Sequence, residues 1–183
     1  MTGEISFRSL AEEDLPLIHH WLNQDHVAEW YGVGGVRRPT FDQVEARYGR
    51  RIRGEEPTRS FLVSYGGRPV GYIQTYLVDD YPENARGIEL EPRTAGIDMF
   101  IGEPEMVGRG LGTALIVRFL RQVVFADPAV KACVLGPAPE NTRAIRCYEH
   151  AGFRYLKTVQ APGDDAVTEY WMIVRRDEAE GGR

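Results

Sequence analysis

The amino-acid sequence predicts a mixed α/β fold, of the α+β kind, in which helices cover both faces of a twisted, mostly antiparallel sheet. Two observations carry this prediction. Alternating apolar and polar residues form two hairpin patterns, one in each half of the chain. Between the hairpins lies a strand–helix–strand unit, whose helix opens with three glycines at alternate positions. With 183 residues, 43% of them hydrophobic, the chain is long enough for one domain with a sizeable core.

The N-terminal part is expected to form one strand and two helices. Residues 5–10 alternate as a strand does. Asp14 can cap a first helix, with Pro16 tolerated in its first turn. Thr40 begins a second helix over residues 40–52, and the charged residues of this helix suggest that it lies on the surface.

A hairpin, a loop and a central strand are expected next. Residues 60–65 and 69–78 are strand-like and are joined by Gly-Gly-Arg, which is a hairpin signal. Residues 79–91 are rich in acids, and they form either a solvated loop or a lip that attracts a cationic substrate. Residues 94–101 form an apolar strand that contains one acid, Asp98.

Three glycines, Gly108, Gly110 and Gly112, lead into an amphipathic helix within residues 106–125. Glycine allows a close approach of the backbone to a ligand, and the first N–H groups of a helix attract anions. The stretch is therefore either a diphosphate cradle or an ordinary turn before a core helix. The expected apolar face of the helix consists of Ile116, Phe119, Leu120 and Val123.

The C-terminal part is expected to contain a strand, a helix and a second hairpin. The strand covers residues 130–135. Asn141 caps the helix that follows, and Gly152 ends it. Residues 153–159 and 166–175 form the hairpin, and a polar tail begins at residue 177.

Composition excludes several functional classes. The net charge of -5 does not indicate a nucleic-acid partner, and a mildly acidic surface would suit a cationic substrate. Cys133 and Cys147 make neither a disulfide framework nor a metal-ligand spacing, and the four histidines show no metal pattern. We therefore expect no metal. The start of the chain has no apolar signal core, and no apolar run approaches the roughly 20 residues that span a bilayer, so we expect a cytoplasmic protein without a membrane partner.

V-G-R-G-L-G-T stands at the start of one helix, and N-T-R-A-I-R-C-Y-E-H-A-G-F follows further along. Together these two stretches resemble the GNAT superfamily of acetyl-CoA-dependent N-acetyltransferases. The resemblance implies a GNAT fold, a single acetyltransferase domain over residues 1–176 with a tail at 177–183, and acetyl-CoA as cosubstrate. The residues that it implies for coenzyme binding are Phe100, Ile101, Val107, Gly108, Arg109, Gly110, Leu111, Gly112, Thr113, Asn141 and Tyr148.

Four longer blocks of the chain are H-V-A-E-W-Y-G, G-Y-I-Q-T-Y, A-G-I-D-M-F-I-G-E-P-E-M-V-G-R-G-L-G-T and R-A-I-R-C-Y-E-H-A-G-F. These blocks look more specifically like the aminoglycoside 6'-N-acetyltransferases of the resistance type. This likeness implies acetyl transfer to the 6'-amine of an aminoglycoside by direct attack in a ternary complex. The substrate-binding positions implied are Trp30, Tyr31, Glu56, Gln74, Tyr76, Glu83 and Asp98. The family usually has an aspartate where this chain has Gly136, so one cationic anchor is missing.

Asp98 is the candidate catalytic base. An amine must lose a proton before it attacks a thioester, and a carboxylate whose pKa is raised by burial can accept that proton. Asp98 is the acid within an apolar strand. Alternatively, Asp98 lies on the exposed side of its strand, since alternation places it with Phe100 and opposite Ile97 and Met99.

Tyr148 is the candidate catalytic acid, because a phenol with an ordinary pKa of about 10 can protonate a leaving thiolate. It is otherwise a core tyrosine that packs its helix onto the sheet. A backbone N–H near Phe100 or Ile101 is expected to hold the oxyanion. Asn141 either caps its helix alone or also binds the pantetheine or adenylate arm of the coenzyme.

Other functions remain open. Siderophore-pathway acetyltransferases share an N-terminal His-Trp, as in H-H-W-L-N, and such an enzyme or another small-amine acetyltransferase is the nearest competitor. A non-catalytic module that binds acyl-CoA or an antibiotic, and a protein lysine or N-terminal acetyltransferase, are further alternatives. Trp30 and Tyr31 either belong to the core or form, with Gln74 and Tyr76, a floor for the substrate. We expect a monomer or a homodimer.

Overall fold

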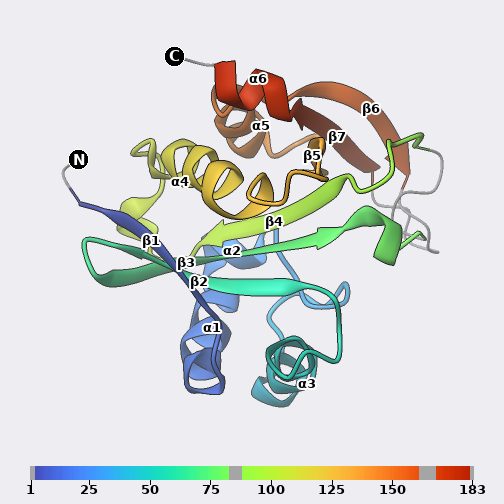
Figure 1. The fold of residues 1–183 in the computed structure, drawn as a ribbon. Coiled ribbons are helices and arrows are strands. Elements are labelled where there is room, and N and C mark those ends of the chain that lie inside the picture. Colours follow the sequence, from blue (N-terminus) through green and yellow to red (C-terminus); the bar gives the residue numbers. More distant parts are fainter. Residues whose placement is uncertain (1–2, 83–87, 161–167, 182–183) are drawn as a thin grey trace. The chain divides into compact units, whose positions relative to one another are not determined.

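The computed structural model describes residues 3–82, 88–160 and 168–181 (Figure 1). Seven strands form one mixed sheet in the order β1-β2-β3-β4-β5-β7-β6. The β4–β5 pair is parallel, and the pairs β1–β2, β2–β3, β5–β7 and β6–β7 are antiparallel, which confirms the predicted fold class. The chain divides into two compact units, the first comprising residues 1–75 and 98–109 and the second comprising residues 76–97 and 110–183.

The first unit builds its core between strands and helices. β1 (Ile5–Ser9), β2 (Arg59–Tyr65) and β3 (Arg68–Leu77) pair in sequence. Figure 1 shows α1 (Leu15–Leu22) and α3 (Phe41–Ile52) on one side of these strands, and α2 (Asp25–Ala28) links the two helices. The core between these elements includes Ile18, Trp21, Leu22, Val44, Tyr48, Leu62, Tyr72 and Phe100.

The ends of α3 and α1 show one correct and one wrong prediction. Thr40 caps α3 as expected: its Oγ1 accepts from Gln43 N at 3.4 Å, and its own N–H donates to Gln43 Oε1 at 2.9 Å. Asp14 precedes α1 but makes no capping bond to it. Its carboxylate instead accepts two bonds from Arg8, at 2.6 and 2.7 Å, because a bidentate charge-assisted pair is stronger than a single cap bond.

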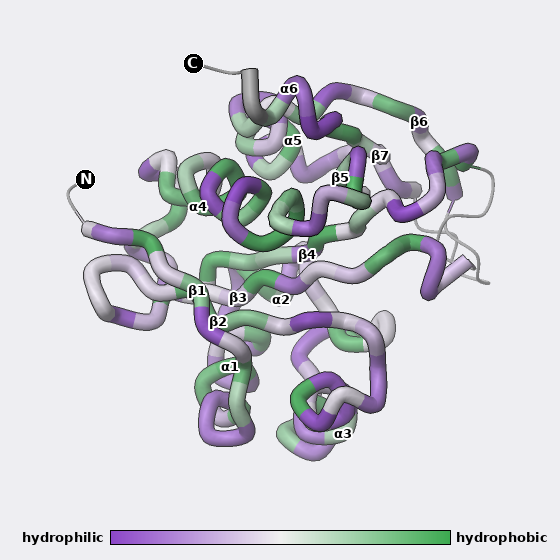
Figure 2. The backbone as a smooth tube through the Cα atoms, viewed as in Figure 1, coloured by the Kyte–Doolittle hydropathy of each residue, from purple (hydrophilic) through white to green (hydrophobic). Residues whose placement is uncertain are grey.

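The surface helix α3 is amphipathic. Figure 2 shows mostly hydrophilic residues along it, as its charges predicted. Val44 and Tyr48 are nevertheless almost fully buried and attach the helix to the core of the first unit. This anchoring determines which arginines of α3 face the strands.

The second unit has helices and strands in alternation. β4 (Ala95–Ile101) pairs with β5 (Ala132–Leu135) through Ala95↔Cys133. β7 (Thr168–Arg175) lies between β5 and β6 (Arg154–Gln160), so the expected hairpin is confirmed, although its turn lies outside the described residues. The helices are α4 (Leu111–Phe119), α5 (Thr142–His150) and α6 (Arg176–Gly181). Short 3-10 turns occur at Glu12–Asp14 (η1), Val78–Asp80 (η2) and Pro104–Met106 (η3).

Two details of the second unit differ from the sequence-based expectation. α4 continues as a π-helical turn, Leu120–Val124 (η4), which shifts the side-chain phase, so that Val124 is buried and Val123 is half-buried. The expected polar tail begins instead with α6, because the Arg176 guanidinium donates to the carbonyl groups of Phe125, Asp127 and Val130. Within residues 3–82, 88–160 and 168–181, no helix is long and apolar enough to cross a membrane.

Candidate active site

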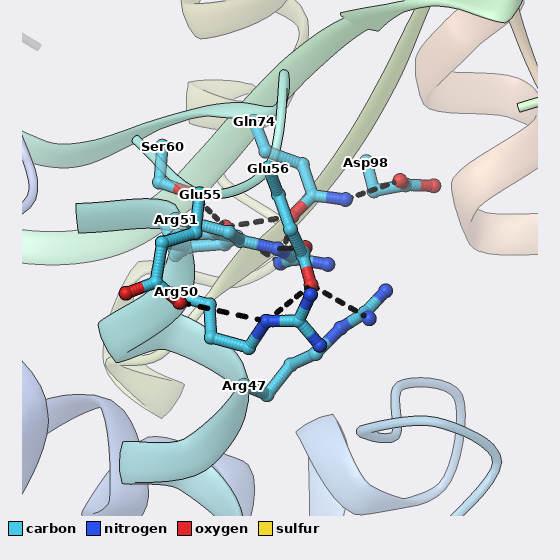
Figure 3. A network of polar contacts seen from close by, with 9 residues as sticks. Arg47, Arg50, Arg51, Glu55, Glu56, Ser60, Gln74 and Asp98 are labelled. Atoms are coloured by element: carbon cyan, nitrogen blue, oxygen red, sulfur yellow. Dashed lines mark hydrogen bonds and ion pairs between the residues drawn. The ribbon is translucent and has the colours of Figure 1, made fainter. Parts of the chain in front are cut away.

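The end of β4 that belongs to the first unit lies close against β3. A Cβ atom on Gly71 would come within 2.4 Å of the Phe100 carbonyl oxygen, so only glycine permits this approach. The side chains of Gln74 on β3 and Asp98 on β4 face each other there, and Gln74 Nε2 donates to Asp98 Oδ2 at 2.7 Å (Figure 3).

Asp98 is half-buried and hydrogen-bonded, which rules out the alternative of a solvent-facing carboxylate. Burial raises the pKa of Asp98 above its ordinary value, while the Gln74 hydrogen bond and the positive charge of Arg51 oppose that rise. A carboxylate with a raised pKa is a stronger base than an exposed one. This group can therefore accept a proton from a bound ammonium.

Three aromatic side chains, Tyr31, Tyr72 and Phe100, pack against one another near this pair, and the Tyr72 hydroxyl donates to Gln74 Oε1 at 2.7 Å. The Phe100 ring stacks on Tyr72 with centroids 5.4 Å apart, and Tyr31 meets Phe100 edge-on at 5.0 Å. Burial raises the pKa of Tyr31 well above its usual range and that of Tyr72 to about 12, so both phenols stay protonated. Tyr31 thus packs against the core of the first unit, whereas Trp30 is half-buried at the end of the α2 turn.

Glu56 is surrounded by arginines of α3. Its Oε1 lies 3.4 Å from Arg47 and 3.6 Å from Arg50, and its Oε2 lies 3.3 Å from Arg51. The Glu56 side chain is only 9% exposed. The carboxylate implied as an amine ligand is therefore already paired with three guanidinium groups.

Arg51 was not among the site residues expected from the sequence. It donates to Gln74 Oε1 at 2.5 Å and to the Tyr72 hydroxyl at 3.3 Å. The spacing of Arg47, Arg50 and Arg51 places them on one helical face, and this was the available signal.

Tyr76 and the acidic loop belong to the second unit. The Tyr76 ring occupies the space over Gly96, where a Cβ atom would lie 2.5 Å from it, and it meets Tyr81 edge-on at 5.3 Å. Tyr76 is also packed against a buried cluster that includes Val78. Glu83 lies outside the described residues.

The glycine loop before α4 has the conformation that a backbone cradle requires. Gly108 and Gly110 both have φ of +77°, and a Cβ atom on either would meet nothing within 4 Å. Glycine is thus needed here for its torsion angle rather than for space. Gly110 is the N-cap of α4, and the first N–H groups of the helix have no partner within it, so an anion can bind there.

The other members of the loop have different surroundings. Val107 N donates to Pro104 O at 3.2 Å, which closes η3, and Arg109 is exposed. Leu111 and Gly112 are buried in the first turn of α4, and Gly112, unlike Gly108 and Gly110, does not have a positive φ.

Three of the expected coenzyme residues lie on α4 or α5: Thr113 on α4, Asn141 at the N-cap of α5 and Tyr148 within α5. Thr113 Oγ1 donates to the Cys147 carbonyl at 3.2 Å, which ties the two helices together. Asn141 Oδ1 accepts from Ala144 N at 3.1 Å, so its capping role is confirmed. Tyr148 is half-buried on α5 with its ring 6.3 Å from that of Phe153.

The last residue of β4 is tied to α2. The Ile101 carbonyl oxygen accepts a hydrogen bond from His26 Nε2 at 3.0 Å, which requires the tautomer protonated on Nε2. This bond orients the peptide between Ile101 and Gly102. Where the structure describes the chain, it has no group of three His, Cys, Asp or Glu side chains placed to hold a metal ion.

Comparison with known proteins identifies the family of the chain. Residues 11–161 match the acetyltransferase (GNAT) domain family. An aminoglycoside N(6')-acetyltransferase type 1 of Klebsiella pneumoniae is 36% identical over 98% of this chain and 87% of its own. A lysine N-acyltransferase, MbtK, of Mycolicibacterium paratuberculosis is 26% identical over 78% of this chain and 62% of its own.

A solved structure has the same fold. The structure of AAC(6')-Ib in complex with ribostamycin and coenzyme A superposes with a TM-score of 0.88, at 32% identity, over 98% of both chains. Both the sequence match and the superposition extend over nearly the whole chain. The protein therefore belongs to the GNAT acetyltransferase family, among relatives of the aminoglycoside 6'-N-acetyltransferases.

Proposed function

We propose that this protein transfers an acetyl group from acetyl-CoA to a primary amine of a small cationic substrate, namely the 6'-amine of an aminoglycoside, and thereby confers antibiotic resistance. The observation that carries the proposal is the 36% identity to an aminoglycoside N(6')-acetyltransferase over 98% of the chain. The half-buried carboxylate of Asp98, with its raised pKa, supplies the base that such a reaction needs.

The proposed reaction is a direct attack in a ternary complex. The amine nitrogen forms a bond to the thioester carbonyl carbon, and its proton passes to Asp98 directly or through a water molecule. The C–S bond then breaks, and the departing thiolate takes a proton from the Tyr148 hydroxyl. A backbone N–H near Phe100 or Ile101 stabilises the oxyanion between these steps.

The coenzyme is proposed to bind along the glycine loop and the start of α4. The left-handed Gly108 and Gly110 and the free N–H groups of the helix support pyrophosphate binding there. Phe100, Ile101, Val107, Arg109, Leu111, Gly112 and Thr113 are proposed to contribute through backbone groups, and Asn141 through its side-chain amide. The thioester supplies the activated acetyl group.

The acceptor is proposed to bind among Trp30, Tyr31, Gln74, Tyr76 and Asp98. Glu56 and Glu83 complete the set implied by the resemblance, although the arginine pairs of Glu56 argue for an indirect role. We further infer that residues 1–176 act as one acetyltransferase domain, as a monomer or a homodimer in the cytoplasm.

Coenzyme A release measured with a thiol reagent tests this proposal. Kanamycin or tobramycin with acetyl-CoA should release the thiol, and a matched aminoglycoside with a hydroxyl in place of the 6'-amine should not. Mass spectrometry with fragmentation should place the acetyl group on the 6' nitrogen. The absence of turnover on every 6'-amino compound would refute the substrate assignment.

A second candidate is a siderophore-pathway or other small-amine N-acyltransferase. Two observations favour it: Gly136 stands where the family usually has an acid, and Glu56 is already paired. A relative that is a lysine N-acyltransferase is 26% identical. The same thiol assay with lysine, a hydroxylamine and a polyamine distinguishes this candidate, and unchanged behaviour of Asp98→Asn and Tyr148→Phe would favour a non-catalytic binding module.

A further inference from the structure

The guanidinium of Arg51 lies at the centre of the polar network in Figure 3. Its side chain is only 7% exposed. Its Nε donates to Glu56 Oε2 at 3.3 Å, and its Nη1 donates to Gln74 Oε1 at 2.5 Å. A buried cation on α3 thus touches the amide that holds the candidate base.

These bonds determine which way the Gln74 amide points. An amide has an acceptor end and a donor end, and arginine can only donate. Gln74 Oε1 accepts from Arg51 and also from the Tyr72 hydroxyl at 2.7 Å. A flipped amide would place its NH₂ group against the guanidinium, which has no acceptor. Gln74 Nε2 must therefore point to Asp98 Oδ2.

Each hydrogen bond of the network has a defined donor and acceptor. Because the single proton of the Tyr72 hydroxyl goes to Gln74, the Ser60 hydroxyl at 2.7 Å must donate to Tyr72. Glu56, which is 9% exposed, anchors the other side of the Arg51 guanidinium. The orientation of Gln74 is thus imposed from α3, and not by Asp98 alone.

We propose that Arg51 is a positioning residue of the acceptor site: it orients the Gln74 amide so that its NH₂ group holds the Asp98 carboxylate ready to receive the proton of the incoming amine. The catalytic part of this inference rests on the proposed function of Asp98. The orienting part rests on the contacts alone.

The charges around Asp98 agree with this role. The titratable groups that bear on it are Arg51 from α3, Tyr31 after α2, Tyr48 on α3 and Tyr72 on β3. The three phenols are protonated and therefore uncharged at neutral pH, so Arg51 is the charged group among these four. Its positive charge and the Gln74 hydrogen bond oppose the rise that burial causes in the pKa of Asp98.

Titration of Asp98 in the free protein tests the proposal without any substrate. The ¹³Cγ chemical shift of Asp98, assigned with Asp98→Asn, is followed against pH in wild type and in Arg51→Met, which keeps the apolar stem. We expect the pKa of Asp98 to rise by about one unit, since an opposite charge nearby lowers a carboxyl pKa by about 1–3 units. Arg51→Lys, which keeps the charge, should return the pKa of Asp98 most of the way to its wild-type value.

Arg47→Met is the matched control. Arg47 lies on the same helix and pairs with the same Glu56, but its side chain is 42% exposed and its bond is to the other carboxylate oxygen. It should leave the Asp98 titration as in wild type. Where an acceptor amine is turned over, Arg51→Met should lower kcat about tenfold with KM for acetyl-CoA unchanged, and should move the acid limb of the kcat profile to higher pH.

The positioning role of Arg51 and the proposed acetyl transfer can be refuted independently of each other. An Asp98 titration in Arg51→Met that matches Arg47→Met overturns the positioning role, whatever the activity. A shifted titration without turnover of any amine supports the positioning role and refutes the acetyl transfer. If Arg51→Met does not fold, the comparison of Arg51→Lys and Arg51→Gln gives the same decision, because only the first keeps the charge.

Discussion

The carboxylate network of Arg51, Gln74 and Asp98 and the glycine loop of Gly108 and Gly110 are built in opposite ways. The network joins side chains from α3, β3 and β4, which are far apart in the sequence. The loop relies on torsion angles of adjacent residues and on backbone N–H groups. The loop can therefore be recognised from a short motif, whereas the network exists only once the strands and α3 are packed. We accordingly expect changes in the network to affect proton transfer, and changes in the loop to affect coenzyme affinity.

The largest effect is expected for Asp98→Asn. It removes the base but keeps an acceptor for Gln74 Nε2, so the packing should survive. We expect kcat to fall about 10²–10⁴-fold, the usual contribution of general base catalysis, with KM for acetyl-CoA unchanged. Steady-state kinetics with a 6'-amino aminoglycoside measure this, and a loss confined to the affinity for acetyl-CoA would contradict the division between the two regions.

The same substitution should change stability in a direction set by pH. Because the folded-state pKa of Asp98 is raised, its ionisation costs stability at every pH above the unfolded-state pKa of about 3.9. The cost is complete above the folded-state pKa and absent below the unfolded one. Asp98→Asn should therefore be more stable than wild type at pH 7 and should lose that advantage as the pH falls towards 3. Denaturant unfolding at several pH values measures this difference in stability. An Asn variant that is less stable than wild type at pH 7 would contradict a raised pKa of Asp98 in the folded state.

Tyr148→Phe tests the proton donor of the second unit and should have the next largest effect. Removal of a general acid costs about 10²-fold in kcat, while the half-buried ring still packs near Phe153. KM for acetyl-CoA should stay within about twofold, since the loop is untouched. Tyr155→Phe is the control, because Tyr155 is 51% exposed on β6. Equal kcat values for the two variants would indicate that Tyr148 packs its helix onto the sheet and is not the catalytic acid.

Gly110→Ala should act on coenzyme affinity instead of kcat. A side chain at φ of +77° costs about 1–2 kcal/mol, so the cradle will adopt its conformation less often. We expect the Kd for coenzyme A to rise about tenfold in isothermal titration calorimetry. Gly67→Ala is the matched control, since Gly67 has φ of +80° in the β2–β3 turn with equally open space. It should lose similar stability with unchanged coenzyme binding, and a similar loss of affinity in both variants would show only general destabilisation.

The same contrast explains how much could be predicted from the sequence. Local signals succeeded: the Thr40 cap, the Asn141 cap and the two hairpins depend on neighbouring residues, and all are present. The mixed sheet followed from their order. The catalytic and binding roles of Asp98 and Tyr148 came from the family resemblance and remain predictions.

What the sequence missed depends on contacts between distant segments. Arg51 faces Gln74 only because Val44 and Tyr48 anchor α3 to the core. The π-helical turn that buries Val124 is a property of packing rather than of helical periodicity. Asp14 was expected to cap α1, yet it pairs with Arg8 on β1, and no local pattern distinguishes these partners.

The smallest predicted effect concerns Gly136. The family resemblance suggests that an acid at this position would bind the substrate, whereas the packing beside Trp171 favours glycine. If the family's acid binds a substrate amine, Gly136→Asp should lower KM for an aminoglycoside by about two- to fivefold, since an exposed ion pair contributes up to about 1 kcal/mol. A Cβ atom there would lie 3.2 Å from Trp171 Nε1, which already donates to Glu169 at 2.8 Å, so the indole must also move. Gly136→Asn has the same shape without the charge. A lower KM for Gly136→Asp alone would mean that this chain lacks an acid that binds the substrate amine in its relatives. An equal rise of KM in both variants would mean that the Trp171 indole requires glycine at this position. Selection of the amine would then depend on the Asp98 network.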